Sequence, residues 1–185
     1  MGAAVFYEKA LDSVSVIDLL KMGQIQERIG YTLYRAAMQA ERPAEFGERM
    51  IQSVANYQKA KEFYGRMSEQ AKTPRILRCD AMIAQLSYWL TSEASEKKRL
   101  INASWRLAKE CLKAFELVDS ALEYGETFNQ LSASVDLGFS FEWLQTRKIM
   151  IEEALECGEL AIRFLSTTRN SFELATAYMK TATFL

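Results

Sequence analysis

Residues 53–60 read Ser-Val-Ala-Asn-Tyr-Gln-Lys-Ala, with a small residue, an aromatic residue four positions later and an alanine three positions after that. On an α-helix these three positions share one face, because residues three and four apart lie on the same side. Small residues let a partner helix approach closely, and the aromatic ring fills the space one turn along. The stretch therefore predicts one helix of a closely packed helical pair.

The pattern recurs along the chain, which makes a repeat architecture the first possibility to test. Ala3-Tyr7-Ala10 matches all three positions of the pattern. Two further places, Ile101-Trp105-Ala108 and Ala154-Gly158-Ala161, each match two of the three. The final alanines of successive copies lie 50, 48 and 53 residues apart. The sequence therefore predicts a row of helical hairpins.

Apolar residues spaced three and four apart continue between these copies, and the strict alternation typical of strands does not persist anywhere. Breaks and capping signals separate the helical stretches: Ser15 to Asp18, Pro43, Thr73-Pro74, Gly138 with Ser140, and Asn170 to Glu173. We expect an all-α fold in a single helical-repeat domain over residues 1–185, with helices at 3–12, 16–41, 43–68, 74–91, 93–117, 119–138, 142–166 and 171–185.

The recurring pattern, together with Ile29-Gly30 where Leu-Gly is expected in the preceding helix, resembles the tetratricopeptide repeat (TPR). The resemblance implies a TPR-like α-solenoid, a right-handed superhelix of about three to four antiparallel helical hairpins whose first helices line a concave groove. The family's unit has about 34 residues, so the helices of this chain must be longer. An irregular helical bundle with ordinary core packing is the alternative.

The composition removes several classes of function. The chain has no His, so the commonest general base and metal ligand are both missing. With 23 Lys and Arg against 24 Asp and Glu, it has no basic excess for nucleic acid, and Lys97-Lys98-Arg99 is interpreted as a solvated helix face. Cys79, Cys111 and Cys157 lie far apart on apolar stripes, which indicates reduced thiols packed as small apolar groups. We expect no cofactor and no metal.

Motifs for catalysis are also missing. No phosphate-binding glycine loop and no serine nucleophile motif is present. Glu152, Glu153 and Glu156 could serve acid–base chemistry, but a solvated acidic face opposite Ile151 explains them better. We therefore expect a protein that is not an enzyme.

The first 20 residues do not form a secretory signal, because they lack a basic start and carry Glu8, Lys9, Asp12 and Asp18. No apolar run approaches the roughly 18 residues that a membrane-spanning helix needs. We expect a cytoplasmic protein without a membrane span.

The resemblance implies that the first hairpin contributes Gln24, Glu27, Tyr31, Tyr34 and Arg35 to a partner-binding groove. Helical phase adds further candidates from the later hairpins: Arg78, Gln85, Tyr88, Glu123, Glu126 and Gln130. Tyr31, Tyr34 and Arg35 are the strongest, because Tyr and Arg are enriched at interface hot spots. The alternative is that the two tyrosines pack against the next helix.

The expected function is a non-catalytic adaptor that binds a protein or peptide partner in this groove. The alternative is a helical sensor that binds an apolar small molecule or lipid in its interior, suggested by the 8 Met, 10 Phe and 8 Tyr residues. An interior pocket would favour the sensor, and a tightly packed core with an open groove would favour the adaptor.

The last helix, 171–185, is unusually apolar for the end of a repeat array. Terminal repeats normally turn a polar face outward. This helix instead carries six large apolar residues: Phe172, Leu174, Tyr178, Met179, Phe184 and Leu185. We expect another hairpin, another domain or a second copy to cover it, so that the chain is a homo-oligomer or the N-terminal part of a longer protein.

Overall fold

The computed structural model describes residues 2–13, 18–118, 120–142 and 144–185, and within these ranges the chain forms helices and connecting turns without a strand. The predicted all-α class is confirmed. In chain order the elements are α1 (Gly2–Ser13), α2 (Leu19–Ala37), α3 (Pro43–Tyr64), α4 (Glu69–Leu90), α5 (Ala94–Leu117), α6 (Ala121–Leu131), α7 (Ala133–Gly138), the short 3₁₀ helix η1 (Phe139–Phe141), α8 (Leu144–Ser166) and α9 (Ser171–Ala182).

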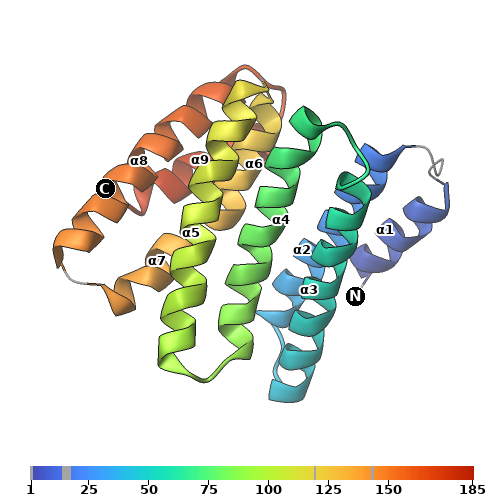
Figure 1. The fold of residues 1–185 in the computed structure, drawn as a ribbon, viewed down its shortest axis with the longest axis horizontal. Helices are drawn as coiled ribbons and strands as arrows, with labels where there is room; N and C mark the ends of the chain where they lie inside the picture. The colour runs from blue at the N-terminus through green and yellow to red at the C-terminus, as the bar shows by residue number, and fades with distance from the viewer. Residues whose placement is uncertain (1, 14–17, 119, 143) are drawn as a thin grey trace.

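The helices pack in neighbouring pairs (Figure 1). The hairpin α2–α3 is followed by the hairpin α4–α5, and α8 packs against α6, which precedes it in the chain. At the two ends, α1 packs against α2, and α9 packs against α8 and α6. Each of α2, α4 and α6 is therefore the first helix of a pair, and each of α3, α5 and α8 is the second.

One hydrogen bond recurs in the first two pairs and defines the repeat register. The Ser53 hydroxyl donates to the Gly30 carbonyl at 2.7 Å, and the Ser104 hydroxyl donates to the Ala81 carbonyl at 2.9 Å. Both bonds join residues 23 apart, and the second bond lies 51 residues after the first. Ser104, three residues after Ile101, therefore corresponds to Ser53, whereas the sequence pattern aligned Ile101 with it.

The close approach behind this bond depends on glycine. An added Cβ at Gly30 would lie 2.9 Å from the Tyr57 ring and 3.3 Å from the Ser53 carbonyl oxygen. The predicted role of Ser53-Tyr57-Ala60 is therefore confirmed, and all three residues are fully buried against α2 and the core.

Local capping chemistry explains three helix starts. The Asp18 carboxylate accepts from the backbone N–H of Lys21 at 3.0 Å and caps α2. Pro43 is the first residue of α3, as predicted. The Asn170 side chain accepts from the backbone N–H of Glu173 at 3.2 Å, which confirms the predicted cap of α9. The cap expected at Ser15 lies outside the described residues.

The predicted start of a helix at Thr73-Pro74 is wrong, because α4 begins at Glu69 and holds Pro74 in its interior. The Thr73 hydroxyl donates to the Glu69 carbonyl at 2.8 Å instead of capping a new helix. Pro74 is buried, and its carbonyl accepts from the Cys111 thiol at 3.1 Å. Packing against α5 thus outweighs the backbone bond that the proline removes.

The other predicted helix boundaries lie closer to those of the structure. The helix expected at 119–138 divides at the buried Ser132 into α6 and α7, which lets α7 pack against α5. Gly138 ends α7 as predicted, and α8 begins only at Leu144. The helix expected at 16–41 runs from Leu19 to Ala37.

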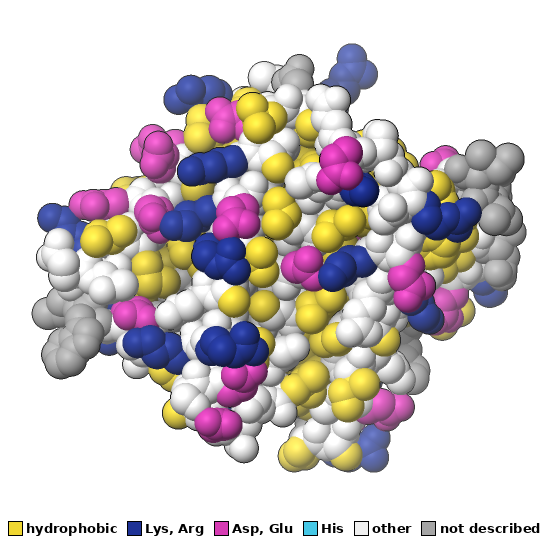
Figure 2. All heavy atoms as spheres, viewed as in Figure 1, with side chains coloured by type: hydrophobic (Ala, Val, Ile, Leu, Met, Phe, Trp, Pro, Cys, Tyr) yellow, Lys and Arg dark blue, Asp and Glu magenta, His cyan; other side chains and the backbone are white. Residues whose placement is uncertain are grey.

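Large side chains fill the interior, with Tyr57, Tyr64, Phe115 and Phe128 all below 2% exposure. On the face formed by α3, α4, α5 and α8, basic and acidic side chains are interspersed rather than gathered by sign (Figure 2). Among the described helices, none combines the length and the apolar character that crossing a bilayer requires.

Candidate functional site

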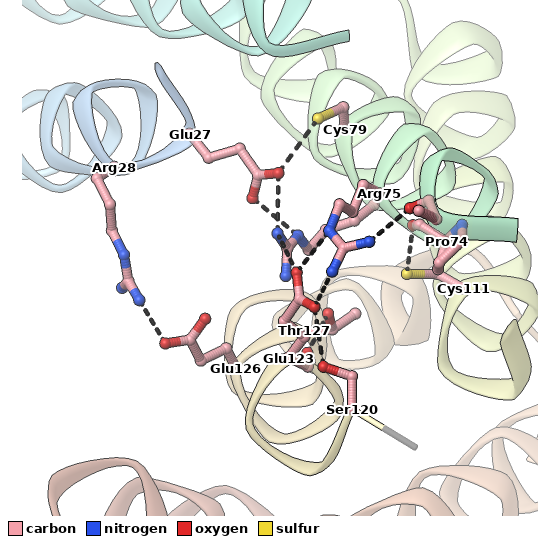
Figure 3. A network of polar contacts seen from close by, with 12 residues as sticks. Glu27, Arg28, Pro74, Arg75, Cys79, Cys111, Ser120, Glu123, Glu126 and Thr127 are labelled. Carbon is pink, nitrogen blue, oxygen red and sulfur yellow. Dashed lines mark hydrogen bonds and ion pairs between the residues drawn. The ribbon is translucent and has the colours of Figure 1, made fainter. Parts of the chain in front are cut away.

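A buried ion network joins the first helices of three successive pairs (Figure 3). Arg78 of α4 donates to Glu27 of α2 at 2.9 Å, and a second contact joins its Nε to the same carboxylate at 2.8 Å. Toward α6, Arg78 lies 3.6 Å from Glu123, which also receives two hydrogen bonds from Arg75. Acid, arginine and acid thus alternate across α2, α4 and α6.

The network is dry. The side chains of Glu27 and Arg78 are 7% and 3% exposed. Burial disfavours the charge on Arg78, but the surrounding Glu27, Tyr64 and Glu123 more than offset this and raise the pKa of Arg78 well above its usual value. The guanidinium also lies 5.2 Å from the centre of the Phe115 ring. The arginine stays charged, so it works as a fixed electrostatic link between helices.

A small hollow of about 190 Å³ opens beside the network. Arg28 of α2 and Glu126 of α6 form an ion pair at its rim. The residues that line it are Gln24, Glu27, Arg28, Arg78, Leu122, Glu123, Glu126 and Gln130. All of these except Arg28 and Leu122 belong to the eleven predicted groove residues, so the hollow brings six of the eleven together.

A larger hollow of about 670 Å³, called the groove below, lies between α2 and α9 with α6 and α7 at its side. The three strongest candidates, Tyr31, Tyr34 and Arg35, line it from α2. Across from them α9 contributes Phe172, Met179 and Lys180. The fold therefore brings the predicted residues of α2 opposite the apolar last helix.

Tyr31 and Tyr34 both contact the core and the groove, so each has a share in packing. Both are half-buried, and their ring centres are 6.1 Å apart. The exposed Arg35 donates to the Tyr31 hydroxyl at 3.5 Å. Burial raises the pKa of Tyr34, so its hydroxyl is neutral and able to donate a hydrogen bond.

Two predicted residues lie elsewhere. Gln85 is completely buried and accepts from the Ser134 hydroxyl at 2.7 Å, which places it in the packing between α4 and α7. Tyr88 contacts Trp89, Phe141 and the amino group of Lys97, and it lines neither hollow.

Sequence reasoning missed several groove residues, among them Asn129 and Lys180. The signal was present: Glu27, Arg78, Asn129 and Lys180 follow one another at intervals of 51 residues, and each lines one of the two hollows. Asn129 is 7% exposed and donates to Glu173 of α9 at 2.7 Å. Its amide oxygen is buried and has no hydrogen-bond partner within the described residues.

With this geometry in hand, the sequence was compared with known proteins. No protein-family model matches the chain, and no curated protein matches it significantly. The function must therefore be argued from the site itself.

The other candidate features have local partners. Glu153 accepts from Lys109 at 2.7 Å, while Glu152 and Glu156 are exposed on α8. Burial raises the pKa of Cys111 to about 12 and that of Cys157 to about 11, so both thiols are protonated at neutral pH. Over the described part of the chain, no three Cys, Asp or Glu side chains are placed to hold a metal ion.

Proposed function

We propose that this chain is a tetratricopeptide-like helical repeat that acts as a non-catalytic adaptor and binds a segment of a partner protein in the groove between α2 and α9. The observation that carries the proposal is the groove's lining. Tyr31, Tyr34 and Arg35 on one wall face Phe172 and Met179 on the other. Aromatic side chains and arginine are the residues that most often dominate the affinity of protein interfaces.

The lining also indicates the chemistry of the segment. Phe172 and Met179 are 75% and 59% exposed, so an apolar partner side chain would remove both from water. Arg35 and Lys180 supply positive charge on opposite walls. A segment that alternates apolar and acidic side chains fits this set.

The packed interior supports the groove over an interior ligand site. The central positions are filled by large side chains, of which Tyr57, Phe115 and Phe128 are below 2% exposure. A volume of about 670 Å³ lies within the roughly 300–1,000 Å³ typical of ligand sites, and here it belongs to the groove.

Affinity capture from the native lysate tests the proposal, with wild type compared with the Tyr31→Ala/Tyr34→Ala/Arg35→Ala variant. Because the tyrosines also touch the core, the single variant Arg35→Glu provides a test at an exposed position. We expect both variants to lose the partner that wild type recovers, and the matched control Gln58→Ala/Lys59→Ala on the exposed side of α3 to keep it. Equal recovery by wild type and Arg35→Glu, together with unchanged affinity for the recovered segment in calorimetry, would rule the groove out.

A further inference from the structure

The last helix, α9, leaves open the face that the other first helices use for pairing. In α2 and α4 this face is marked by Gly30 and Ala81, whose carbonyls accept from the serine of the following helix. The residue 51 positions after Ala81 is the fully buried Ser132, and a further 51 positions lead to the exposed Thr183. On α9, therefore, the pairing face has no second helix within the described residues.

Large apolar side chains lie on this open face. Phe172 and Met179 are 75% and 59% exposed. The spacing of seven residues keeps Phe172 and Met179 on one side of α9, and the C-cap residue Thr183, four positions further on, continues that side. A second helix would cover them as α3 covers α2.

The helix α1, at the other end of the described chain, also has an apolar face that is not covered. It precedes α2 in the chain and packs against it, as α3 does against α4 and α8 against α9. By this position α1 corresponds to a second helix that packs against the first helix of the next pair. Its side chains Val5 and Phe6 are 47% and 74% exposed, whereas Tyr7 and Leu11 are half-buried.

We propose that α1 of one copy of this chain packs against the open face of α9 of a second copy and completes a helical pair between them. Phe6 and Val5 would cover Phe172 and Met179, and the exposed Glu8 has the charge that Arg35 and Lys180 beside this face attract. The two chain ends lie on opposite sides of the molecule (Figure 1), so the contact joins different copies head to tail. Such an interface is heterologous, and it propagates rather than closing at a dimer.

Sedimentation of wild type and two end-blocked variants over a dilution series tests this inference. Phe6→Glu blocks α1 and leaves α9 intact, and Met179→Glu blocks α9 and leaves α1 intact. We expect the average mass of wild type to rise beyond twice the monomer with concentration, and each variant alone to stay at the monomer mass of 21.1 kDa. An equimolar mixture of the two variants should form a dimer and nothing larger, because one intact pair of ends remains.

Each alternative has a different signature, and each overturns the proposal. A wild type that stays monomeric at the highest concentration excludes the contact. A Phe6→Glu variant that dimerises alone shows that α9 pairs with α9. Circular dichroism checks that the variants keep their helicity, and Phe172→Glu replaces Met179→Glu if the latter does not. The inference goes beyond the adaptor function, and because Phe172 and Met179 also line the groove, α1 of a second copy and a partner segment compete for them. No partner protein is present in this experiment, so its failure leaves partner capture unaffected.

Discussion

At the scale of single residues, the interior of this protein holds charges that the packing of paired helices does not need. Removing Glu27 and Arg78 from water costs free energy, which their mutual contacts only partly return. Their value lies in where they sit, since Arg78 contacts carboxylates from both neighbouring first helices. The pair therefore fixes the relative position of α2, α4 and α6 more than it adds to stability.

Replacing Arg78 alone should be strongly destabilising. In Arg78→Met the Glu27 carboxylate stays buried without its cation, and we expect the free energy of unfolding to fall by about 3–5 kcal/mol. The double variant Glu27→Gln/Arg78→Met removes both charges and should recover a large part of this loss. Chemical denaturation measures both. A single variant as stable as wild type would show that Glu27 is not held as a buried charge.

Glu142 should contribute a pH-dependent share of stability. The hydrogen bond from Asn102, at 2.9 Å, and the nearby Lys98 hold the pKa of Glu142 below its usual value. A lowered pKa in the folded state stabilises the protein above the unfolded-state pKa of about 4.3 and ceases to do so as the pH falls through the folded value. Glu142→Gln should therefore be less stable than wild type at pH 7, and the difference should shrink below about pH 4.3 and vanish once the pH lies below the lowered pKa of Glu142.

Thermal melting from neutral to acidic pH checks this expectation. Glu152→Gln, at an exposed carboxylate on α8, is the matched control and should follow wild type closely at every pH. A difference between Glu142→Gln and wild type that persists unchanged in acid would contradict the assignment.

At the scale of elements, close helix approach depends on a few small residues. Gly30→Ala would press a methyl group against Tyr57 and the Ser53 carbonyl, both in the packed interface of α2 and α3. We expect a loss of about 1–3 kcal/mol in the free energy of unfolding. Gly47→Ala in α3 is the control, because an added Cβ there meets nothing within 4 Å and raises helix propensity by up to about 1 kcal/mol. If chemical denaturation showed that both substitutions change the free energy of unfolding in the same direction, the packing role of Gly30 would be refuted.

The elements also show what sequence could and could not predict. Helices with caps in their own sequence, such as the one that Asn170 begins, were placed to within a few residues. Pro74 was misplaced because its local preference for a helix start is overridden by contacts with α5, which lie 37 residues away in the chain. The division at Ser132 was missed for the same reason, since it serves the packing of α7 on α5.

The residues of the candidate site also divide into those that the sequence could predict and those that it could not. The resemblance suggested Glu27, and helical phase suggested Arg78 and Glu123, because each of these two lies opposite an apolar stripe on its own helix; all three line the smaller hollow. Neither could separate a groove residue such as Tyr31 from a buried one such as Gln85, since that depends on the neighbouring helix. Lys180 needed the 51-residue register, which only the Ser53 and Ser104 contacts reveal.

At the scale of the whole molecule, protection from hydrogen exchange should be graded from the centre to the ends. The central α4 packs against α3, α5 and α6, whereas α1 packs against α2 and leaves Val5 and Phe6 exposed. Local opening needs least free energy where few apolar contacts are lost. In dilute solution we expect amides of α1 and α9 to exchange fastest and those of α4 slowest, as measured by mass spectrometry. Uniform protection along the chain would contradict this gradient.

The alternation of Glu27, Arg78 and Glu123 also decides which shuffled versions of this chain could fold. The serine-to-carbonyl bonds are the same in the first two hairpins, so backbone geometry alone would allow them to be exchanged or one of them to be deleted. Deleting the α4–α5 hairpin would bring Glu27 against Glu123, two carboxylates without a guanidinium between them, and like charges at such a site resist joint ionisation. The alternating signs of the buried charges therefore restrict the order in which the hairpins can follow one another.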